Sequence, residues 1–356
     1  MNDIFDTNML LGKKVSWLAD NGPEDDIAIS TRIRLARNVR GIPFPTNPTP
    51  ELTTVIVTVE TAVEKTKCLK NPLCFCMAGM ETIDKQILLE RRLISNEFSA
   101  SDPTLKSLIV NESEDISLMV NEEDHLRLQA MHSGFCLMDT WKLIDEVDAK
   151  LSPEIPYAFD RDLGYLTSCP TNVGTGMRAS VMLHLPALVL AGQVRAVIHG
   201  VNKLGLAVRG IFGEGSDNLG NLCQISNQST LGESEESIIN RLQLVVSQII
   251  NHEKNARQKL WEDRRNFLLD SVGRAYGILS NAFMMTSNEA LISLSMIRMG
   301  VDMKLIKSLD IKTVNELFIL SQPAHLQKNS GGELKQEERD VARATLIHKK
   351  LKKHKK

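Results

Sequence analysis

Apolar and polar residues alternate along several short stretches in the first two thirds of the chain. A period of two places apolar side chains on one face of an extended segment, which predicts β-strands buried on one side. The predicted strands lie around residues 27–35, 116–120, 126–128, 178–185 and 204–227, where the last range holds two strands around a glycine-rich connection. These stretches predict a sheet assembled from segments that are far apart in sequence.

Other stretches have the spacing of a helix face. Apolar residues within 144–151 follow a possible N-cap at Asp139, and Pro186 favours the first turn of a helix that we expect to run to about Val201. From Ser234 onward the apolar spacing is helical almost to the end of the chain. A mixed α/β part is therefore expected to precede an all-helical C-terminal part.

This change of pattern gives the predicted domain organisation. The length of 356 residues suits two domains of ordinary size. We expect a short N-terminal segment at 1–26, a catalytic domain at 27–254, a helical domain at 255–347 and a basic tail at 348–356.

Composition is that of a soluble globular protein, with 42% hydrophobic and 24% charged residues. The longest apolar run, 183–192, contains Pro186 and is too short to span a bilayer. The acidic N-terminus lacks a signal-peptide pattern, and six cysteines in so long a chain form no disulfide framework. Cys68, Cys74 and Cys76 have no fourth ligand nearby, so no metal site is predicted. We expect a cytoplasmic protein that does not contact membranes.

Charge is distributed unevenly along the chain. The last eight residues, KKLKKHKK, contain six lysines, and without them 36 basic residues face 44 acidic ones. An acidic body is a poor surface for nucleic acid, so no nucleic-acid partner is expected. The tail is interpreted as a solvated end, with contact to phosphates or an acidic partner as the alternative.

An arginine recurs on the polar side of the predicted strands or in the adjoining turns. The five residues are Arg32, Arg34, Arg127, Arg178 and Arg209. Each one alone is most simply a solvated strand residue. Together around one cleft they would repel unless an anion filled it, and guanidinium groups match phosphate oxygens in pairs. Because the sequence has neither a P-loop nor the kinase HRD and DFG motifs, the set suggests a phosphate cradle built from side chains.

Acidic residues and one cysteine complete the candidate chemistry. The stretch 121–125 (NEEDH) closes a predicted strand, and Glu214 lies in the glycine-rich connection. Each carboxylate alone is consistent with a solvated loop. Cys169 precedes Pro170 at a strand end, where it is either a plain buried thiol or a thiolate whose pKa nearby arginines lower.

Five motifs make the sequence recognisable as a whole. They are STRIRLARN (30–38), NEEDHLR (121–127), CPTNVGT (169–175), RASV (178–181) and RGIFGEGS (209–216). In order and rough spacing they resemble the phosphagen (ATP:guanidino) kinases, over about residues 27–250. The resemblance implies an α+β fold of the glutamine-synthetase-like kind, with a large antiparallel β-sheet flanked by helices and, here, a C-terminal all-helical domain.

Within that family the chain looks most similar to the bacterial protein arginine kinases, which phosphorylate arginine side chains in proteins. Small-guanidine kinases carry a helical domain ahead of the first motif, whereas only some 29 residues precede Ser30 here. We therefore expect a pocket open enough for a polypeptide. The sequence RDVARA matches the branch's RDxxRA phosphoarginine-binding motif and implies an allosteric site at Arg339, Asp340 and Arg343. An ordinary surface charge network is the alternative.

The resemblance also assigns roles residue by residue. Glu123 matches the catalytic carboxylate, Glu214 the second substrate-side carboxylate, and Cys169 the active-site cysteine. The implied nucleotide-binding residues are Ser30, Thr31, Arg32, Ile33, Arg34, Arg92, Arg127, Arg178, Ala179, Ser180, Val181, Met182, Arg209, Gly210, Ile211, Phe212, Gly213 and Glu214. Arg92 stands where relatives often have a histidine, which leaves the contact to the base or ribose open.

Guanidine chemistry explains why such residues are needed. A guanidinium has a pKa above about 12, so only about one in 10⁶ is neutral at pH 7, a cost of roughly 8 kcal/mol. An acceptor at the attacking nitrogen avoids that cost by taking the proton as the bond to phosphorus forms. We assign this role to Glu123, with Glu214 aligning the guanidinium and Cys169 as a third anionic contact. The arginines and Mg²⁺ would stabilise the transferring phosphoryl group.

The resemblance implies partners as well as chemistry. It predicts ATP and Mg²⁺, protein substrates with exposed arginine, a Clp-type unfoldase–protease that receives the tagged proteins, and a zinc-binding activator protein. A homodimer is expected, with part of the helical domain against the second subunit. Two rival functions stay open: a kinase for free arginine or another small guanidine, and a non-catalytic phosphoarginine-binding adaptor.

Overall fold

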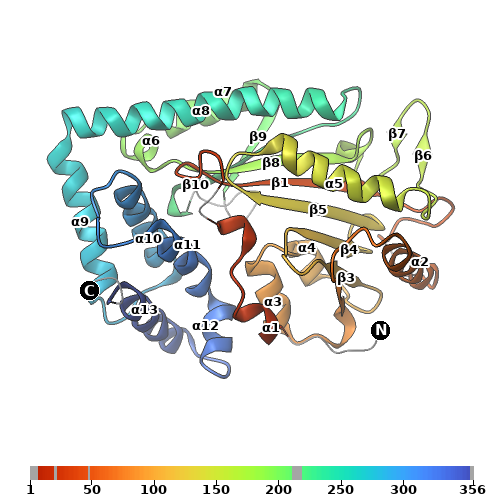
Figure 1. Ribbon diagram of the computed structural model, residues 1–356, viewed down its shortest axis with the longest axis horizontal. Coiled ribbons are helices and arrows are strands. Elements are labelled where there is room, and N and C mark those ends of the chain that lie inside the picture. The colour runs from red at the N-terminus through yellow and green to blue at the C-terminus, as the bar shows by residue number, and fades with distance from the viewer. Residues whose placement is uncertain (1–6, 20–21, 47–48, 211–218, 353–356) are drawn as a thin grey trace.

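A computed structural model of the chain describes residues 7–19, 22–46, 49–210 and 219–352 (Figure 1). Its centre is an antiparallel sheet of eight strands in the order β2-β3-β4-β5-β1-β8-β10-β9. The strands are β1 (Ala28–Arg37), β2 (Leu73–Cys76), β3 (Ser107–Val110), β4 (Ile116–Val120), β5 (Leu126–Ser133), β8 (Met177–His184), β9 (Leu206–Gly210) and β10 (Leu222–Asn227). A separate hairpin pairs β6 (Phe159–Asp160) with β7 (Gly164–Tyr165).

Helices flank this sheet and form the C-terminal part. Those of the first 263 residues are α1 (Asn8–Leu11), α2 (Glu51–Thr66), α3 (Thr82–Glu90), α4 (Asn96–Ala100), α5 (Leu137–Leu151), α6 (Pro186–Leu190), α7 (Val194–Lys203) and α8 (Glu235–Asp263). The C-terminal helices are α9 (Arg265–Asn281), α10 (Ser287–Asp302), α11 (Ile311–Leu320), α12 (Pro323–Asn329) and α13 (Gln336–Lys352). Short 3₁₀ turns are η1 (Ser16–Leu18), η2 (Met77–Gly79), η3 (Pro170–Asn172) and η4 (Leu219–Asn221). The predicted fold class, a large antiparallel sheet flanked by helices with a helical C-terminal region, is confirmed.

The two faces of the sheet differ in polarity. On β1, Ile33 and Leu35 are fully buried on the face that α5 covers, and α8 packs against β8 and β10. Arg32 and Arg34 alternate with them on the opposite face and are half-buried. The alternation in the sequence thus separates a hydrophobic layer under α5 and α8 from a face that carries the charged side chains.

Local signals explain where several helices begin and end. The Ser234 hydroxyl caps α8 by accepting the Ser237 backbone N–H at 3.2 Å. The single helix predicted from Pro186 to about Val201 is instead two helices, α6 and α7, because Gly192 adopts φ 70° between them. Asp139, predicted as an N-cap, lies in the first turn of α5, whose N-cap is Cys136.

Helix α8 spans the upper side of the molecule in Figure 1, and α9 descends from its end into the C-terminal helices. The predicted domain boundary near residue 255 lies within α8, which ends at Asp263, and α9 begins at Arg265. The division into domains stays a prediction. No helix of the described residues combines the length and hydropathy needed to cross a bilayer.

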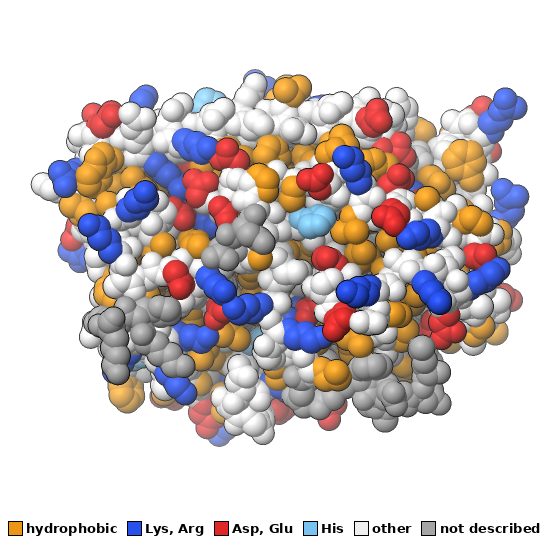
Figure 2. Space-filling model, viewed as in Figure 1, with side chains coloured by type: hydrophobic (Ala, Val, Ile, Leu, Met, Phe, Trp, Pro, Cys, Tyr) orange, Lys and Arg blue, Asp and Glu red, His pale blue; other side chains and the backbone are white. Residues whose placement is uncertain are grey.

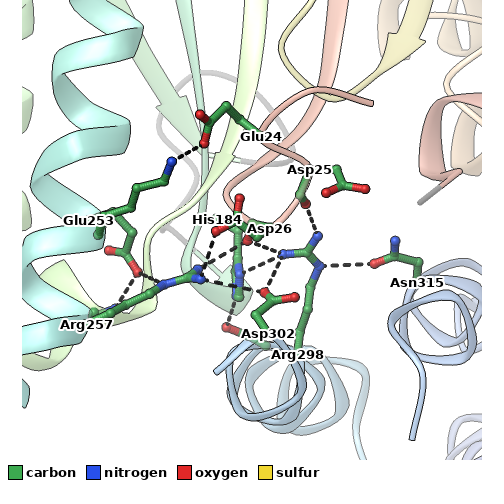
Figure 3. A network of polar contacts seen from close by, with 12 residues as sticks. Glu24, Asp25, Asp26, His184, Glu253, Arg257, Arg298, Asp302 and Asn315 are labelled. Carbon is green, nitrogen blue, oxygen red and sulfur yellow. Dashed lines mark hydrogen bonds and ion pairs between the residues drawn. The ribbon is translucent and has the colours of Figure 1, made fainter. Parts of the chain in front are cut away.

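A buried polar network fixes the helical domain to the end of the sheet (Figure 3). Arg298 of α10 donates to the Asp26 carbonyl at 2.8 Å and to the Asn315 side chain of α11 at 3.1 Å. His184, at the end of β8, contacts Arg298 at 3.2 Å between Nδ1 and Nη1. Removing one member of such a network leaves the others buried and unpaired, which costs free energy. We therefore expect the network to keep a rigid geometry.

The same network continues into α8. The Glu253 carboxylate accepts the backbone N–H groups of Ala187 and Leu188 at the start of α6, each at 3.0 Å, and the Arg257 Nε at 3.0 Å. Arg257 also lies 3.7 Å from Asp302. The network therefore joins α6, α8 and α10 around one end of the sheet.

Candidate active site

The sheet register brings five arginines from four strands onto one face. Arg34 of β1 lies opposite Arg178 of β8 and opposite Gln129 of β5, two residues from Arg127. Arg32 lies opposite Ser180 of β8, and Ser180 lies opposite Ser226 of β10. Gln224, two residues before Ser226, lies opposite Arg209 of β9. Because residues two apart share a face, Arg32, Arg34, Arg127, Arg178 and Arg209 all point to the same side. These are the five arginines that the sequence predicted to surround an anion.

Repulsion between these side chains lowers the pKa of two of them, Arg32 and Arg34. Burial, together with the positive charges of Arg92, Arg127, Arg178 and Arg209, lowers the pKa of Arg32 to about 9. Burial and neighbouring arginines also hold the pKa of Arg34 well below its ordinary value. A guanidinium stays protonated at neutral pH, so this face accumulates positive charge that a bound anion would neutralise.

Arg92 joins the cluster from outside the sheet. It follows α3 with a left-handed φ of 64°, and its carbonyl accepts the Gln129 side-chain N–H at 2.7 Å on the arginine-bearing face. Burial lowers the pKa of Arg92 to about 10. A non-glycine residue in this conformation is held there by its surroundings, here Gln129 and a Trp17 Nε1 bond of 3.0 Å to the Arg91 carbonyl.

Gln224 is a site residue that the sequence analysis missed. Its side-chain carbonyl accepts the Arg32 Nη2 at 2.8 Å, which orients that guanidinium across β8. The two residues are 192 positions apart in sequence, so no local pattern connects them. An uncharged amide suits this position because it orients an arginine without neutralising it.

The acidic turn between β4 and β5 contains two carboxylates with different roles. Glu122 is buried and forms an ion pair with Arg127 and a hydrogen bond with Ser95. Burial alone would raise the pKa of Glu122, but Arg127 and the Ser95 hydroxyl lower it below its usual value. Glu122 therefore positions Arg127, whereas Glu123 is accessible at the tip of the turn.

Glu123 has the acidity expected of a proton acceptor. Partial burial raises the pKa of Glu123, Arg127 opposes this, and Asp124 and Glu122 raise it further. A carboxylate whose pKa is raised toward neutrality is a stronger base, provided that it remains ionised at the working pH.

Asp124 connects the acidic turn to the cysteine loop. Its Oδ1 accepts Asn38 Nδ2 at 2.7 Å and the Ser168 backbone N–H at 2.7 Å. Asn38 in turn accepts the His125 backbone N–H at 2.9 Å. The neighbours of Glu123 and Cys169 are thus joined through one carboxylate, an arrangement that the sequence did not reveal.

The loop that carries Cys169 is held rigidly. The Thr230 hydroxyl donates to the Val173 carbonyl at 2.6 Å, and Gly174 adopts φ 113° against the Thr230 carbonyl. A Cβ atom at Gly174 would lie 2.6 Å from that oxygen, so the position requires glycine. Cys169 itself is half-buried, with its Sγ 3.1 Å from the Thr171 hydroxyl.

The remaining predicted site residues fall into three groups. Ser30, Ser180 and Met182 share the arginine-bearing face of β1 and β8, whereas Thr31, Ile33, Ala179 and Val181 lie on the opposite face, and Gly210 ends β9. Ile211, Phe212, Gly213 and Glu214 lie outside the described residues. Within the described ranges, no group of three His, Cys, Asp or Glu side chains could hold a metal ion.

The RDVARA segment lies on α13, well away in sequence from the arginine cluster. Arg343 is buried, forms an ion pair with Asp340, and donates to the carbonyls of Ser321 at 2.9 Å and Met285 at 2.7 Å. Arg339 is more accessible and donates to the Leu334 carbonyl at 2.8 Å. Arg343 and Asp340 thus bond to the helical domain itself, and a phosphoarginine-binding role for the three residues stays a prediction.

Comparison with known proteins agrees with this geometry. Residues 54–256 match the family model described as ATP:guanido phosphotransferase, C-terminal catalytic domain. Residues 265–356 match the model described as protein-arginine kinase McsB C-terminal domain. The chain therefore belongs to the ATP:guanido phosphotransferases.

Two similar curated proteins, from Geobacillus sp. (strain WCH70) and Bacillus subtilis (strain 168), are named protein-arginine kinase. They are 46% and 44% identical to this chain, over 95% and 94% of it and 94% and 93% of their own length. Together with the two family matches, this makes protein-arginine kinase the enzyme class of the chain.

Solved structures share the fold at lower identity. A lombricine kinase is 24% identical with a TM-score of 0.57, covering 68% of this chain and 70% of its own. A duplicated taurocyamine kinase from Schistosoma mansoni is 22% identical with a TM-score of 0.58, covering 81% of this chain and 41% of its own. At this identity the similarity establishes the fold only.

Proposed function

We propose that the chain transfers the γ-phosphoryl group of ATP to arginine side chains of proteins, at the arginine-bearing face of the sheet. The observation that carries this assignment is the convergence of Arg32, Arg34, Arg127, Arg178 and Arg209 on one face, beside the turn that presents Glu123. Three or four phosphate charges would offset five crowded guanidinium groups, and fixed donors of this kind stabilise a phosphoryl group in transit.

In the proposed mechanism the arginines hold the polyphosphate while Glu123 accepts a proton. The substrate guanidinium loses that proton as its nitrogen forms a bond to the γ-phosphorus. The bond from the γ-phosphorus to the bridging oxygen breaks at the same time, and ADP leaves. Glu122 takes no part in proton transfer and keeps Arg127 aimed at the phosphates through its ion pair. Positioning supplies the remaining acceleration.

Two further anionic groups are proposed on the substrate side. Glu214, from the connection between β9 and β10, would align the planar guanidinium through a second ionic hydrogen bond. Cys169, if it is a thiolate, would be a third anionic contact rather than a nucleophile. The rigid loop around Gly174 and Thr230 supports this, because a fixed sulfur can orient a substrate without forming a bond.

Mg²⁺ is proposed to arrive with the nucleotide. Magnesium is commonly held by substrate phosphates and water with few protein ligands. The lack of a three-residue acidic or histidine cluster among the described residues is compatible with that mode of binding.

The proposed cellular setting follows from the resemblance to bacterial protein arginine kinases. We propose a cytoplasmic enzyme that tags proteins for a Clp-type unfoldase–protease and works with a zinc-binding activator protein. On the face seen in Figure 2, basic and acidic side chains are interspersed, a surface suited to varied protein substrates more than to nucleic acid.

A homodimer is proposed through the helical domain. Phe283 is 85% exposed and Met284 is 49% exposed in the connection between α9 and α10. Neighbouring large apolar side chains with this exposure are typical of an interaction surface. Sedimentation of the wild type and of Phe283→Asp would test it, with a monomeric variant as the expected result.

The experiment that tests the proposed function compares two acceptors. The protein is incubated with ATP, Mg²⁺ and either casein or free arginine, and acid-labile phosphate is measured on each. Phosphate on casein arginine is expected. Labelling of free arginine alone would make the chain a small-guanidine kinase, and no labelling of either would favour a non-catalytic adaptor.

A further inference from the structure

The small hairpin of β6 and β7 projects from the body of the molecule next to the loop that carries Cys169 (Figure 1). It bears two large apolar side chains that water reaches, Phe159 with 51% exposure and Leu163 with 47%. Exposed apolar side chains gathered on one short element are typical of a contact surface. No step of the proposed mechanism uses either residue, so the hairpin is available to bind something other than the reacting groups.

Aromatic packing fixes the position of Phe159. It lies opposite Tyr165 in the hairpin register, and the two rings meet edge to face with centroids 5.2 Å apart. The guanidinium carbon of buried Arg37 lies 3.5 Å from the centre of the Tyr165 ring, and Arg37 donates to Asp148 at 2.7 Å. A side chain that is already held in place loses little conformational freedom when a partner binds. Phe159 is thus a preorganised apolar contact.

Backbone contacts join the hairpin to the cysteine loop. The Tyr165 N–H donates to the Gly174 carbonyl at 2.8 Å, and the Gly174 N–H donates back at 3.3 Å. A Cβ atom at Gly164 would lie 2.5 Å from the Gly174 carbonyl oxygen, so this close approach requires glycine. Cys169 follows Leu166, at the base of the hairpin, by three residues, so their Cα atoms are at most about 11 Å apart.

The base of the hairpin is also bonded to the acidic turn. The Ala158 N–H donates to the Asn38 carbonyl at 2.7 Å, and Asn38 Nδ2 donates to the Leu166 carbonyl at 3.0 Å. The same Nδ2 donates to Asp124 at 2.7 Å, and Asp124 is the neighbour of Glu123. The hairpin therefore adjoins both the turn that presents Glu123 and the loop that presents Cys169.

We propose that the β6–β7 hairpin binds the polypeptide substrate a few residues away from the target arginine, with Phe159 in contact with a large apolar side chain of that substrate. This inference rests on the proposed function, which places the target guanidinium beside Glu123 and Cys169. Phe159 lies within about 20 Å of Cys169, a span of about six extended residues. The kinase would then favour arginines that have apolar neighbours in sequence, as segments of unfolded proteins do.

The position of the hairpin favours a substrate over a second copy of this chain. Any polypeptide whose arginine reaches Glu123 must continue over the surface next to the acidic turn and the cysteine loop, and the hairpin is part of that surface. Its turn is shaped internally, because Asp160 Oδ1 accepts the backbone N–H groups of Asp162 at 2.8 Å and Leu163 at 3.0 Å. The exposed apolar side chains are therefore the part that offers a partner buried contact.

Phosphorylation of two peptides by the wild type tests the inference. Both peptides contain a single arginine, and one has leucine where the other has serine, roughly four residues to each side of the arginine. We expect a KM about fivefold lower for the leucine peptide, with similar kcat, because burial of an apolar side chain adds binding that is equal in the ground state and the transition state.

A set of variants assigns this preference to the hairpin. Phe159→Ser should have similar KM values for the two peptides, and the conservative Phe159→Leu should retain most of the preference for the leucine peptide. Leu244→Ser is the matched control, because Leu244 is 69% exposed on α8, which packs on the side of the sheet opposite the arginines. It should keep the full preference. Thermal unfolding establishes that each variant is folded, and sedimentation compares the oligomeric state of Phe159→Ser with that of the wild type.

Several results would overturn the inference and leave the proposed function intact. They are equal KM values for the two peptides in the wild type, an undiminished preference in folded Phe159→Ser, and a loss of kcat in place of the rise in KM. A changed oligomeric state in Phe159→Ser would make the hairpin a contact between copies of the chain and would overturn it as well. If the wild type phosphorylates neither peptide nor casein, the proposed function fails and the inference fails with it.

Discussion

Arg34 on β1 lies directly opposite Arg178 on β8 in the antiparallel register, with both side chains on the same face of the sheet. Like charges in directly opposed positions destabilise a sheet. Burial and the charges of Arg32, Arg127 and Arg178 hold the pKa of Arg34 well below its ordinary value, although Glu122 acts in the opposite direction. An anion bound on this face would offset the repulsion between the two guanidinium groups.

Removing one member of this pair should separate anion binding from folding. Arg178→Gln is expected to leave the stability of the unliganded protein unchanged or slightly higher, because repulsion is removed. It should weaken ATP and tripolyphosphate binding roughly tenfold to a hundredfold, the range for one charged hydrogen bond. Calorimetry and thermal unfolding measure the two effects. Arg161→Gln, at an exposed position near the small hairpin, is the control and should change neither. Unchanged ATP affinity in Arg178→Gln would count against the phosphate cradle.

Glu123→Gln should abolish phosphoryl transfer while nucleotide binding stays nearly intact. An amide accepts no proton, and the loss of a general base costs on the order of a thousandfold in rate. Single-turnover phosphorylation of casein and calorimetry with ADP measure the two properties. Glu122→Gln is the matched comparison, and it should weaken nucleotide binding because Arg127 loses its ion-pair partner. Near-normal turnover in Glu123→Gln would refute the base assignment.

The pH dependence of the reaction should reflect the raised pKa of Glu123. Partial burial favours the protonated form, so the carboxylate gains its proton at a higher pH than an ordinary glutamate does. Activity is therefore expected to fall on acidification before ordinary glutamates protonate, and to be regained above that pH. The profile of kcat/KM against pH provides the measurement. A value of kcat/KM that stays constant down to the pH at which exposed glutamates protonate would contradict the assignment of the acidic limb to Glu123.

Asp302 in the polar network of Figure 3 should contribute to the pH dependence of stability. Burial raises the pKa of Asp302 to about 6, although Arg298 and Arg257 oppose this, with Asp25 and Asp26 nearby. The folded state then binds this proton more tightly than the unfolded state. Protonated Asp302 therefore stabilises the folded state by at most about 3 kcal/mol. This stabilisation is fully present below the ordinary aspartate pKa and is lost as pH rises through about 6.

Urea unfolding of Asp302→Asn at several pH values between 4 and 7 tests this prediction. The variant should lose part of the decline in stability that the wild type shows over that interval. An identical pH dependence in both proteins would mean that Asp302 does not titrate there.

The RDVARA segment allows ligand binding and folding to be distinguished. Arg343→Ala should reduce the free energy of unfolding by about 3–5 kcal/mol, because Asp340 and two carbonyls lose their buried partner. Arg339→Ala should cost less than about 0.5 kcal/mol, since that side chain is partly exposed. If the segment binds phosphoarginine, Arg339→Ala should lower that affinity without loss of stability. Unchanged phosphoarginine affinity would make Arg339 an ordinary surface residue.

The sequence predicted the strands that have one buried and one polar face. β1 was predictable because Ile33 and Leu35 alternate with Arg32 and Arg34, and β8 because its arginine-bearing face alternates with a hydrophobic one. The break at Gly192 was not predicted, since a single glycine in an apolar stretch does not specify whether a helix continues. The surroundings of His184, at the end of β8, were not predicted either, because its partner comes from α10: its Nε2 lies 2.8 Å from the Ser295 hydroxyl.

The contacts that organise the site were less predictable. Gln224, Asn38 and Trp17 act through partners that are far away in sequence, and their own surroundings give no chemical signal. The distinction between Glu122 and Glu123 was also hidden, because adjacent acidic residues look equivalent until Arg127 and Ser95 bind one of them. Motif resemblance pointed to segments of the chain, whereas the contacts that distinguish the residues within them needed coordinates.

The most direct measurement is a crystal structure of the complex with Mg²⁺, ADP, nitrate and an arginine-containing peptide, where nitrate occupies the place of the transferring phosphoryl group. We expect the phosphates within hydrogen-bonding distance of the strand arginines, and the Glu123 carboxylate facing the peptide guanidinium. Phosphates bound on another surface, or a peptide guanidinium remote from Glu123, would contradict the account.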